Sequence, residues 1–287
     1  MGAIFRHELR NYFHSLTAYV FGAFLLAVVG LGSVLYNLQA AVSNFEFVLS
    51  FASIIFVVIV PILTMRTLAE ERRQRTDQLL YSLPITTTQV VLGKYLALLV
   101  VYLIPLAVIS LYPLLFSQFG DVYLPTSYGS LFAFFMMGAA LLAVGMFLSS
   151  LTDNQGFAAG IGIAAILLNY YSVSLAEYTS STAMGSLIAL YVIALLLGVV
   201  IHNLTRNENL AYGVTIVLIG ALAVAYFFNS TAFEGLLPDI MTKLSLFRQF
   251  SSFVNGAFDL TAIVYYVSVM GFFLFLTVQS LEKRRYN

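Results

Sequence analysis

Long apolar runs, separated by short polar segments, make up most of the chain. Eight of these runs are long enough and uncharged enough to cross a bilayer as helices. They cover residues 17–38, 50–65, 90–116, 129–149, 156–176, 185–201, 210–228 and 261–281. The pattern therefore predicts an all-α, polytopic helical membrane protein with about eight spans.

Two further segments have amphipathic patterns. In residues 1–16, apolar side chains recur at helical spacing between polar ones, which favours a helix lying in the membrane interface. The alternative is an extension of the first span whose polar side chains snorkel to water. Residues 229–259 form a second such segment, with apolar positions at Ile240, Leu244, Phe247 and Val254. This pattern predicts an amphipathic or re-entrant helix on the external side.

The distribution of Lys and Arg predicts the orientation of the spans. Short loops rich in these residues are retained in the cytoplasm. With eight spans and both termini inside, only Lys243 and Arg248 lie outside. The other eleven basic residues are then cytoplasmic: Arg6, Arg10, Arg66, Arg72, Arg73, Arg75, Lys94, Arg206, Lys283, Arg284 and Arg285. We therefore expect cytoplasmic N- and C-termini.

Composition excludes several classes of protein. Hydrophobic residues make up 61% of the chain and charged residues 9%, whereas soluble domains carry about 25% charged residues. Acidic and basic residues balance at 13 each, so no basic field exists to attract nucleic acid. The chain has no cysteine, and His7, His14 and His202 lack the spacing of metal ligands. Neither a nucleic-acid partner nor a metal site is predicted.

The polar segment between the second and third predicted spans, residues 66–94, concentrates charge, with five basic and three acidic residues. Within it, Thr76 can cap a short helix that Pro84 would end. That helix would carry three leucines on one side, Leu79, Leu80 and Leu83. A short cytosolic helix with an exposed leucine face requires a partner.

This segment resembles the membrane subunits of type-2 ABC exporters, especially the permeases of gliding-motility and nitrous-oxide-reductase-maturation systems. Those permeases carry the pattern E-E-R-x-x-x-T-x-x-L-L-x-x-L-P-I-T, followed by G-K before the next span. The matching residues here are Glu70, Glu71, Arg72, Thr76, Leu79, Leu80, Leu83, Pro84, Ile85, Thr86, Gly93 and Lys94. The resemblance implies that residues 76–83 form a coupling helix that docks on an ATPase, with ATPase-coupling residues Glu70, Glu71, Arg72, Thr76, Asp77, Leu79, Leu80, Leu83 and Pro84.

The resemblance extends to both ends of the chain. The stretch HELRNYFHSLTAYVF is similar to the family's N-terminal signature, and FRQFSSFVNGAFDLTAIVYYV is similar to its closing signature. The family core has six spans, so eight spans imply an inserted pair. The predicted organisation is an interfacial helix (1–16), spans one and two (17–65), a coupling loop and helix (66–94), spans three to five (95–178), an inserted span pair (179–228), an external amphipathic segment (229–259) and the last span with a basic tail (260–287).

The chain has no phosphate-binding loop of its own. Gly93-Lys94 is followed by Tyr95 and lacks the upstream glycine that such a loop needs. We therefore expect no cofactor in this chain, with ATP and Mg used by a partner ATPase. Coupling to an ion gradient is disfavoured, because the cores of the predicted spans essentially lack ionisable side chains, with Lys94 and Asp259 only at span edges.

Two sets of residues allow alternative interpretations. Gly156 and Gly160 lie four apart on one face of the fifth predicted span, a spacing for close helix packing, although small residues are common in membrane helices generally. Glu70, Glu71 and Asp77 could be paired catalytic carboxylates. However, they lie among four arginines on a solvated loop, where ion pairing is the ordinary explanation. No catalytic residue is predicted.

Together these observations predict the permease subunit of an ABC transporter, an exporter by resemblance, in a bacterial or archaeal plasma membrane. Its expected partners are an ABC ATPase dimer, a second permease copy or a paralogous permease, and the lipid bilayer. Two alternatives remain open: a membrane scaffold that anchors an ATPase, and an integral membrane enzyme that modifies lipids. The residues do not indicate the substrate.

Overall fold

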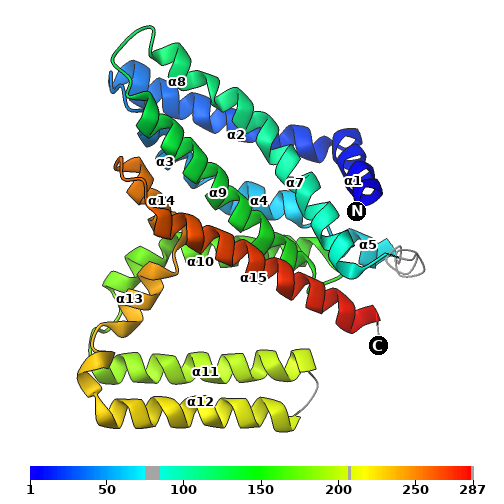
Figure 1. Cartoon of the computed structure of the whole chain (residues 1–287), viewed down its shortest axis with the longest axis vertical. Coiled ribbons are helices and arrows are strands. Elements are labelled where there is room, and N and C mark those ends of the chain that lie inside the picture. The colour runs from blue at the N-terminus through cyan, green and yellow to red at the C-terminus, as the bar shows by residue number, and fades with distance from the viewer. Residues whose placement is uncertain (75–84, 206–207, 286–287) are drawn as a thin grey trace. The chain divides into compact units, whose positions relative to one another are not determined.

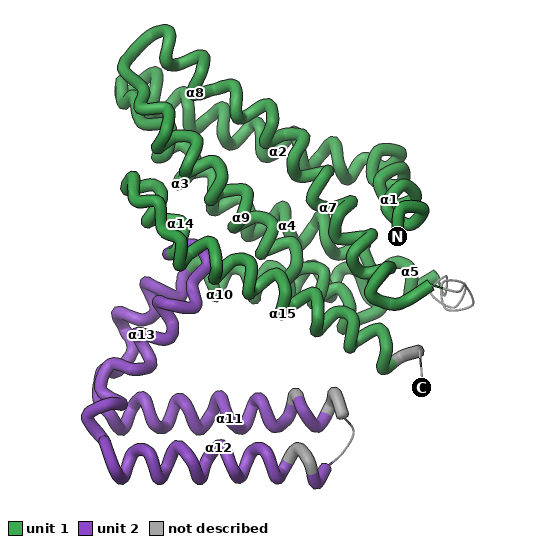
Figure 2. Tube along the Cα trace, in the orientation of Figure 1, with its two compact units in different colours: residues 1–170, 249–287 green, residues 171–248 purple. Residues whose placement is uncertain are grey.

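A computed structural model describes the backbone of residues 1–74, 85–205 and 208–285 (Figure 1). The described residues form helices joined by short turns and loops, which confirms the all-α prediction. The chain divides into two compact units (Figure 2). Unit 1 comprises residues 1–170 and 249–287, and unit 2 comprises residues 171–248.

Unit 1 is a bundle of long apolar helices with shorter helices at its ends. Five described segments are long and apolar enough to cross a membrane: Leu16–Gln39, Thr87–Phe116, Leu124–Ser149, Gln155–Glu177 and Leu260–Lys283. The bundle elements are α1 (Gly2–His14), α2 (Leu16–Gly32), the π-helix η1 (Ser33–Gln39), α3 (Phe45–Ser53), α4 (Phe56–Thr64), α5 (Ala69–Gln74), α7 (Thr87–Ile109), α8 (Leu111–Phe116), α9 (Leu124–Ser149), α10 (Gln155–Glu177) and α15 (Leu260–Arg285). Helix α10 continues into unit 2.

Helix α7 packs against α9 within unit 1. Two tyrosines of α7, seven residues apart, donate hydrogen bonds to carbonyl oxygens of α9: Tyr95 to Ala139 at 2.9 Å and Tyr102 to Phe134 at 2.8 Å. A carbonyl oxygen has a second lone pair beside its helical bond, so each buried hydroxyl is satisfied without breaking α9. Gly138 makes room for the Tyr102 ring, because a Cβ there would lie 2.5 Å from the hydroxyl oxygen.

The second predicted span differs from the expectation of one continuous helix over residues 50–65. Its helical segments Phe45–Ser53 and Phe56–Gln74 meet at an angle of 58°. The break falls at Ile54 and Ile55, where the Ile55 amide bonds the Ala52 carbonyl in a tighter turn. The helix also begins five residues earlier than predicted, at Phe45. An apolar pattern reveals neither feature, because both halves are equally apolar.

Unit 2 contains a helical hairpin. Its helices α11 (Ala183–Thr205) and α12 (Glu208–Phe228) pack on each other. They correspond to the predicted inserted pair. Their described apolar stretches, Ala183–Val199 and Tyr212–Phe228, are of 17 residues or fewer, so membrane spanning by this pair stays a prediction.

The hairpin is followed by short helices that bring the chain back to the start of the hairpin. These are the 3-10 helix η2 (Ser230–Phe233) and α13 (Leu236–Lys243). Between them, the Gly235 amide donates to the Ser181 carbonyl at 2.8 Å. Gly235 has φ +69°, a conformation that glycine adopts without the steric cost of a side chain. The chain therefore enters and leaves the hairpin at neighbouring points.

The two amphipathic segments are helical where the pattern predicts it. Residues 2–14 form α1, which ends at Ser15. The predicted external segment contains two short helices rather than one, α13 and α14 (Leu246–Val254). In unit 1, the α14 residues Phe250 and Phe253 are buried. The Ser130 hydroxyl of α9 donates to the Phe253 carbonyl at 2.9 Å.

Candidate functional site

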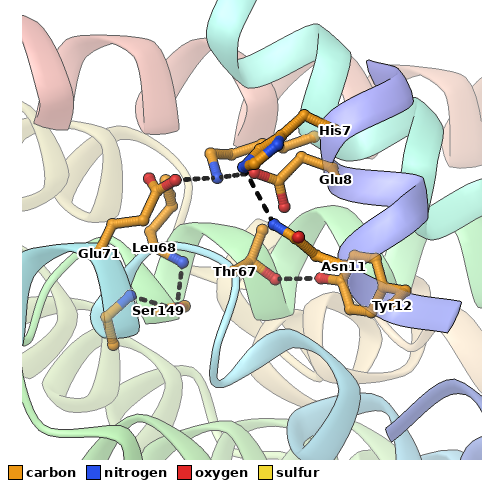
Figure 3. Close-up of polar contacts among 10 residues, drawn as sticks. His7, Glu8, Asn11, Tyr12, Thr67, Leu68, Glu71 and Ser149 are labelled. Atoms are coloured by element: carbon orange, nitrogen blue, oxygen red, sulfur yellow. Dashed lines mark hydrogen bonds and ion pairs between the residues drawn. The ribbon is translucent and has the colours of Figure 1, made fainter. Parts of the chain in front are cut away.

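A buried lysine joins three helices at the base of the polar segment 66–94. Lys94 of α7 is 1% exposed. Its Nζ donates to Glu8 Oε1 of α1 and to Glu71 Oε1 of α5, both at 2.7 Å. Figure 3 shows the two glutamates approaching each other from different helices. The ion pairs therefore connect segments that lie 86 and 23 residues away from Lys94 in the chain.

The residue before Lys94 allows α1 to come this close. Gly93 packs against the first turn of α1, where an added Cβ would lie 3.1 Å from Ile4 Cγ2 and 3.4 Å from the Met1 carbonyl. The start of α7 is fixed by a capping box, in which Gln89 and Thr86 each accept from the other's backbone N–H. The Gly-Lys pair of the sequence pattern thus has two roles: glycine admits the helix, and lysine binds its carboxylate.

The ion network is electrostatically uneven. One ammonium group faces two carboxylates, and the side chains of Lys94, Glu8 and Glu71 are 1%, 10% and 23% exposed. A lysine buried to this extent stays charged only with close partners. Beside the network, Tyr12 and Thr67 share a hydrogen bond of 3.2 Å between their hydroxyls. Burial raises the pKa of Tyr12, so its hydroxyl is neutral at physiological pH.

A serine of α9 fixes the start of α5. The backbone amides of Leu68 and Ala69 donate to Ser149 Oγ at 3.3 and 3.2 Å (Figure 3). Ser149 Oγ in turn donates to the Met65 carbonyl at 3.2 Å. The first amides of a helix have no partner within it. Ser149 therefore acts as an N-terminal cap supplied by another helix.

Further contacts tie the same region to the end of the bundle. Arg72, whose side chain is 3% exposed, has its Nη1 4.0 Å from Asp153 Oδ1 in the loop after α9. The Ser280 hydroxyl of α15 donates to the Ser150 carbonyl at 3.2 Å. Residues 65–72 thus contact α1, α7, α9 and the loop after α9, and they form a fixed base of the polar segment.

A pocket of about 680 Å³ lies between α1 and this base. Arg66 is one of the residues that line the pocket, and its guanidinium donates to Thr17 Oγ1 at 3.4 Å. The residues that line the pocket include three glutamates as well as Lys94. They are Ala3, Ile4, His7, Glu8, Asn11, Tyr12, His14, Ser15, Thr17, Arg66, Thr67, Glu70, Glu71, Gln74 and Lys94. Most of the residues that line the pocket are polar or charged.

The predicted coupling residues divide into two groups. Glu71 and Arg72 belong to the contacts above, and Glu70 accepts from Gln74 Nε2 at 3.3 Å on the pocket wall. The remaining ones lie outside the described residues: Thr76, Asp77, Leu79, Leu80, Leu83 and Pro84. Their predicted helix and its docking role stay predictions.

The predicted packing glycines, Gly156 and Gly160, are exposed on α10. A Cβ at Gly160 would meet nothing within 4 Å in the described part of the chain. A partner for this face therefore has to come from elsewhere, and the packing role stays a prediction. Close approach within unit 1 uses other glycines, such as Gly162, where a Cβ would lie 2.9 Å from Pro61 Cβ.

Sequence reasoning missed three residues of this site. In the sequence, Glu8 is one of the polar residues that separate the apolar positions of α1, yet it lies four residues from both Ile4 and Tyr12, on the stripe that packs inward. A lone carboxylate on an inward stripe could have indicated a buried cation partner. Thr67 and Ser149 carried no such signal, because hydroxyl groups are common at the ends of membrane helices.

The arrangement fixes positions rather than supplying reactive groups. Lys94 is neutralised by its ion pairs, Ser149 is occupied by backbone bonds, and no cluster of three metal-ligating side chains occurs in the described residues. What the contacts can do is hold both ends of the polar segment, at Thr67–Arg72 and at Lys94, against the bundle.

Comparisons with known proteins agree with this architecture. The family model described as ABC-2 family transporter protein matches residues 30–176. The match runs from α2 to α10 and includes the polar segment and Lys94. A search of curated proteins and a search of solved structures found no match. Because the family model covers more than half of this multi-pass membrane protein, the chain belongs to the ABC-2 family of transporter proteins.

Proposed function

We propose that the chain is the permease subunit of an ABC exporter, driven by a separate ATPase that docks on residues 76–83. The family supports a membrane component of an ABC transporter, a class that works with an ABC ATPase. The single observation that carries the docking site is the Lys94 network, which secures the segment containing residues 76–83 at both of its ends.

The geometry supports a mechanism of coupling by displacement. ATP binding and hydrolysis on the partner would move residues 76–83. The base of the segment is bonded to α9 through Ser149 and to α1 and α7 through Glu71 and Lys94. Such rigid contacts transmit a displacement to the spans instead of absorbing it in a loose loop. The broken second span, which runs directly into this base, would be the first element to move.

The finer assignments belong to the same proposal. The chain belongs with the permeases of gliding-motility and nitrous-oxide-reductase-maturation systems, whose sequence pattern it resembles, and it pairs with a second copy or a paralogous permease. ATP and Mg are bound by the ATPase dimer. The end of unit 1 that carries α1, α5 and the C-terminal end of α15 (Figure 1) faces the cytoplasm of a bacterial or archaeal cell, since it holds most of the basic residues of the unit.

Co-purification tests the proposal. The chain is expressed with the products of its neighbouring genes, purified in mild detergent and examined for an associated ATP-binding protein. We expect an ATPase to accompany the wild type and to be lost from the Leu79→Asp, Leu80→Asp variant. Charged side chains in the leucine face would destroy an apolar docking surface. Reconstitution with ATP then separates a transporter from a scaffold, because only a transporter moves solute.

A matched control is Leu244→Asp. Leu244 is also exposed, at 57%, but lies between α13 and α14 in the predicted external segment. The control should retain the ATPase and the wild-type elution profile. If the double variant retains the ATPase as fully as the control does, docking at residues 76–83 is wrong.

A further inference from the structure

The strongest unexplained feature of unit 1 is a buried carboxyl group in the outer half of the second span. Glu46 lies in the first turn of α3 and is 1% exposed. Its Oε2 has no hydrogen-bond partner in the described residues. The fully buried hydroxyl of Ser127, at the start of α9, lies beside the carboxyl group.

Within the described residues, no cation compensates Glu46. It packs among α2, η1 and α9 through α3, and its neighbour Phe45 contacts the Tyr112 ring of α8. These four elements contain no Asp, Glu, Lys, Arg or His. Their titratable groups are tyrosines, namely Tyr19, Tyr36, Tyr112 and Tyr128. No charged group is among those that act on the Glu46 carboxyl.

The protonation state of Glu46 depends on the balance of two effects. The N-terminus of α3 favours a negative charge in its first turn. Removing an uncompensated carboxylate from water costs several times more than a helix terminus returns. A neutral carboxyl group, in contrast, both donates and accepts, and the nearby Ser127 Oγ has no hydrogen-bond partner within the described residues. The surroundings therefore fit the protonated group.

Glu46 also occupies a mechanically distinct element. Helix α3 is separated from the inner half of its span by the 58° bend at residues 54–55. The inner half continues into the base that Ser149 and Lys94 hold. The outer half is held against its neighbours by side-chain packing, as at Gly32, where a Cβ would lie 3.0 Å from Val48 Cγ1. A polar contact between Glu46 and Ser127 is thus placed where it can retain or release α3.

We propose that Glu46 is a proton-binding site that latches α3 onto α9, and that loss of the proton releases the outer half of the span. The ligand is a proton, the hydrogen-bond partner of the protonated carboxyl group is the hydroxyl of Ser127, and the element that moves is α3. When α3 separates from α9, water reaches the carboxyl group and stabilises the carboxylate. Rising pH therefore favours the released state, and falling pH favours the latched state. The proposal is independent of where an ATPase docks.

Infrared difference spectroscopy tests the protonation. The purified chain at neutral pH is compared with Glu46→Gln, in which an uncharged group of the same shape replaces the carboxyl. We expect the wild type to show the C=O stretching band of a protonated carboxylic acid and the variant to lack it. Identical spectra in this region overturn the proposal. The variant should also fold, because it resembles the protonated state, and failure to fold counts equally against the proposal.

Cysteine labelling tests the release. The chain has no cysteine, so Val48→Cys introduces a single thiol on α3, at a fully buried position with little change in volume. Labelling by a charged maleimide is followed from pH 6.5 to 8.5, with and without Glu46→Gln. Both proteins carry the same thiol, so the titration of the thiol itself cancels when their two labelling rates are compared. We expect the ratio of the two labelling rates to rise by up to about tenfold per pH unit. A ratio that is constant with pH shows that Glu46 does not control α3.

Discussion

At the residue scale, the buried ionic group of Lys94 differs from an ordinary surface pair. Lys243 and Asp239 also form a close pair, at 2.8 Å, but their side chains are 73% and 57% exposed. Exposed pairs of this kind contribute little to stability because water and salt screen them. The Lys94 network costs desolvation of three charges and gives little net stability in return. Its value lies in fixing which parts of α1, α5 and α7 meet.

The first prediction concerns Lys94→Met. The substitution leaves Glu8 and Glu71 facing each other in a mostly buried space without a cation. We expect the free energy of unfolding to fall by roughly 3–5 kcal/mol, the usual cost of removing one partner from a buried pair. Thermal unfolding of the purified protein measures it. Lys243→Met should change the same quantity by no more than about 1 kcal/mol.

A rescue variant separates charge from packing in this prediction. Combining Lys94→Met with Glu8→Gln and Glu71→Gln removes all three charges while keeping similar volumes. Much of the lost stability should return, because uncompensated charge is the cause of the loss. If the triple variant is as unstable as Lys94→Met, the packing of the lysine stem is responsible instead.

Single residues of the site were predictable only where a local pattern marked them. Glu71 and Lys94 stand in the pattern that the sequence shares with exporter permeases, and the structure brings them together. Glu8 and Ser149 come from segments 86 residues before Lys94 and 80 residues after Ala69. Nothing local specifies such partners. Glu46 lies four residues before the predicted second span, so the expectation that span cores lack ionisable groups did not include it.

At the element scale, the apolar pattern predicted most helices because a membrane span must satisfy its backbone internally. The long helices α2, α7, α9, α10 and α15 lie within or around predicted spans. The bend between α3 and α4 was not predictable, since it changes direction without changing composition. Close packing of α7 on α9 depends on Gly138 and on two tyrosine hydroxyls that no periodicity reveals.

The second prediction tests this packing with Gly138→Ala. The new methyl group would lie 2.5–2.6 Å from atoms of the fully buried Tyr102 ring, which is also held by its bond to Phe134. The ring has to shift, so we expect a loss of about 1–3 kcal/mol in the free energy of unfolding. Chemical or thermal unfolding in detergent measures the change.

Gly271→Ala in α15 is the matched control. An added Cβ there meets nothing within 4 Å. Alanine favours a helix interior over glycine, so this variant should be neutral or more stable by up to about 1 kcal/mol. Equal losses at positions 138 and 271 would show that the packing of α7 on α9 is not the cause.

At the scale of the whole molecule, the division into units parallels the family match. Residues 30–176 of the match lie almost entirely in unit 1, whereas the α11–α12 hairpin lies in unit 2 and outside it. The interpretation of the hairpin as an insertion into a six-span core stays a prediction. The eight-span topology likewise stays a prediction.

The third prediction addresses that topology with single cysteines in the cysteine-free chain. If α11 and α12 both cross the membrane, Ser180→Cys and Ala232→Cys react with an impermeant maleimide added outside intact cells, and Glu208→Cys reacts only after lysis. All three positions are exposed in the structure. Asp121→Cys and Leu151→Cys serve as outside and inside references. Labelling of Glu208→Cys in intact cells would show that the hairpin does not span.

The backbone bond between Gly235 and Ser181 bears on how such a chain changes over evolutionary time. The two ends of the hairpin already meet, so the 53 residues between them leave the rest of the chain and return to the same point. One in-frame genetic event can add or delete these 53 residues without altering the distance that the flanking chain must bridge. Paired helices are also gained or lost without inverting any downstream span. The hairpin is thus a place where members of the family can differ in length while keeping the same transport core.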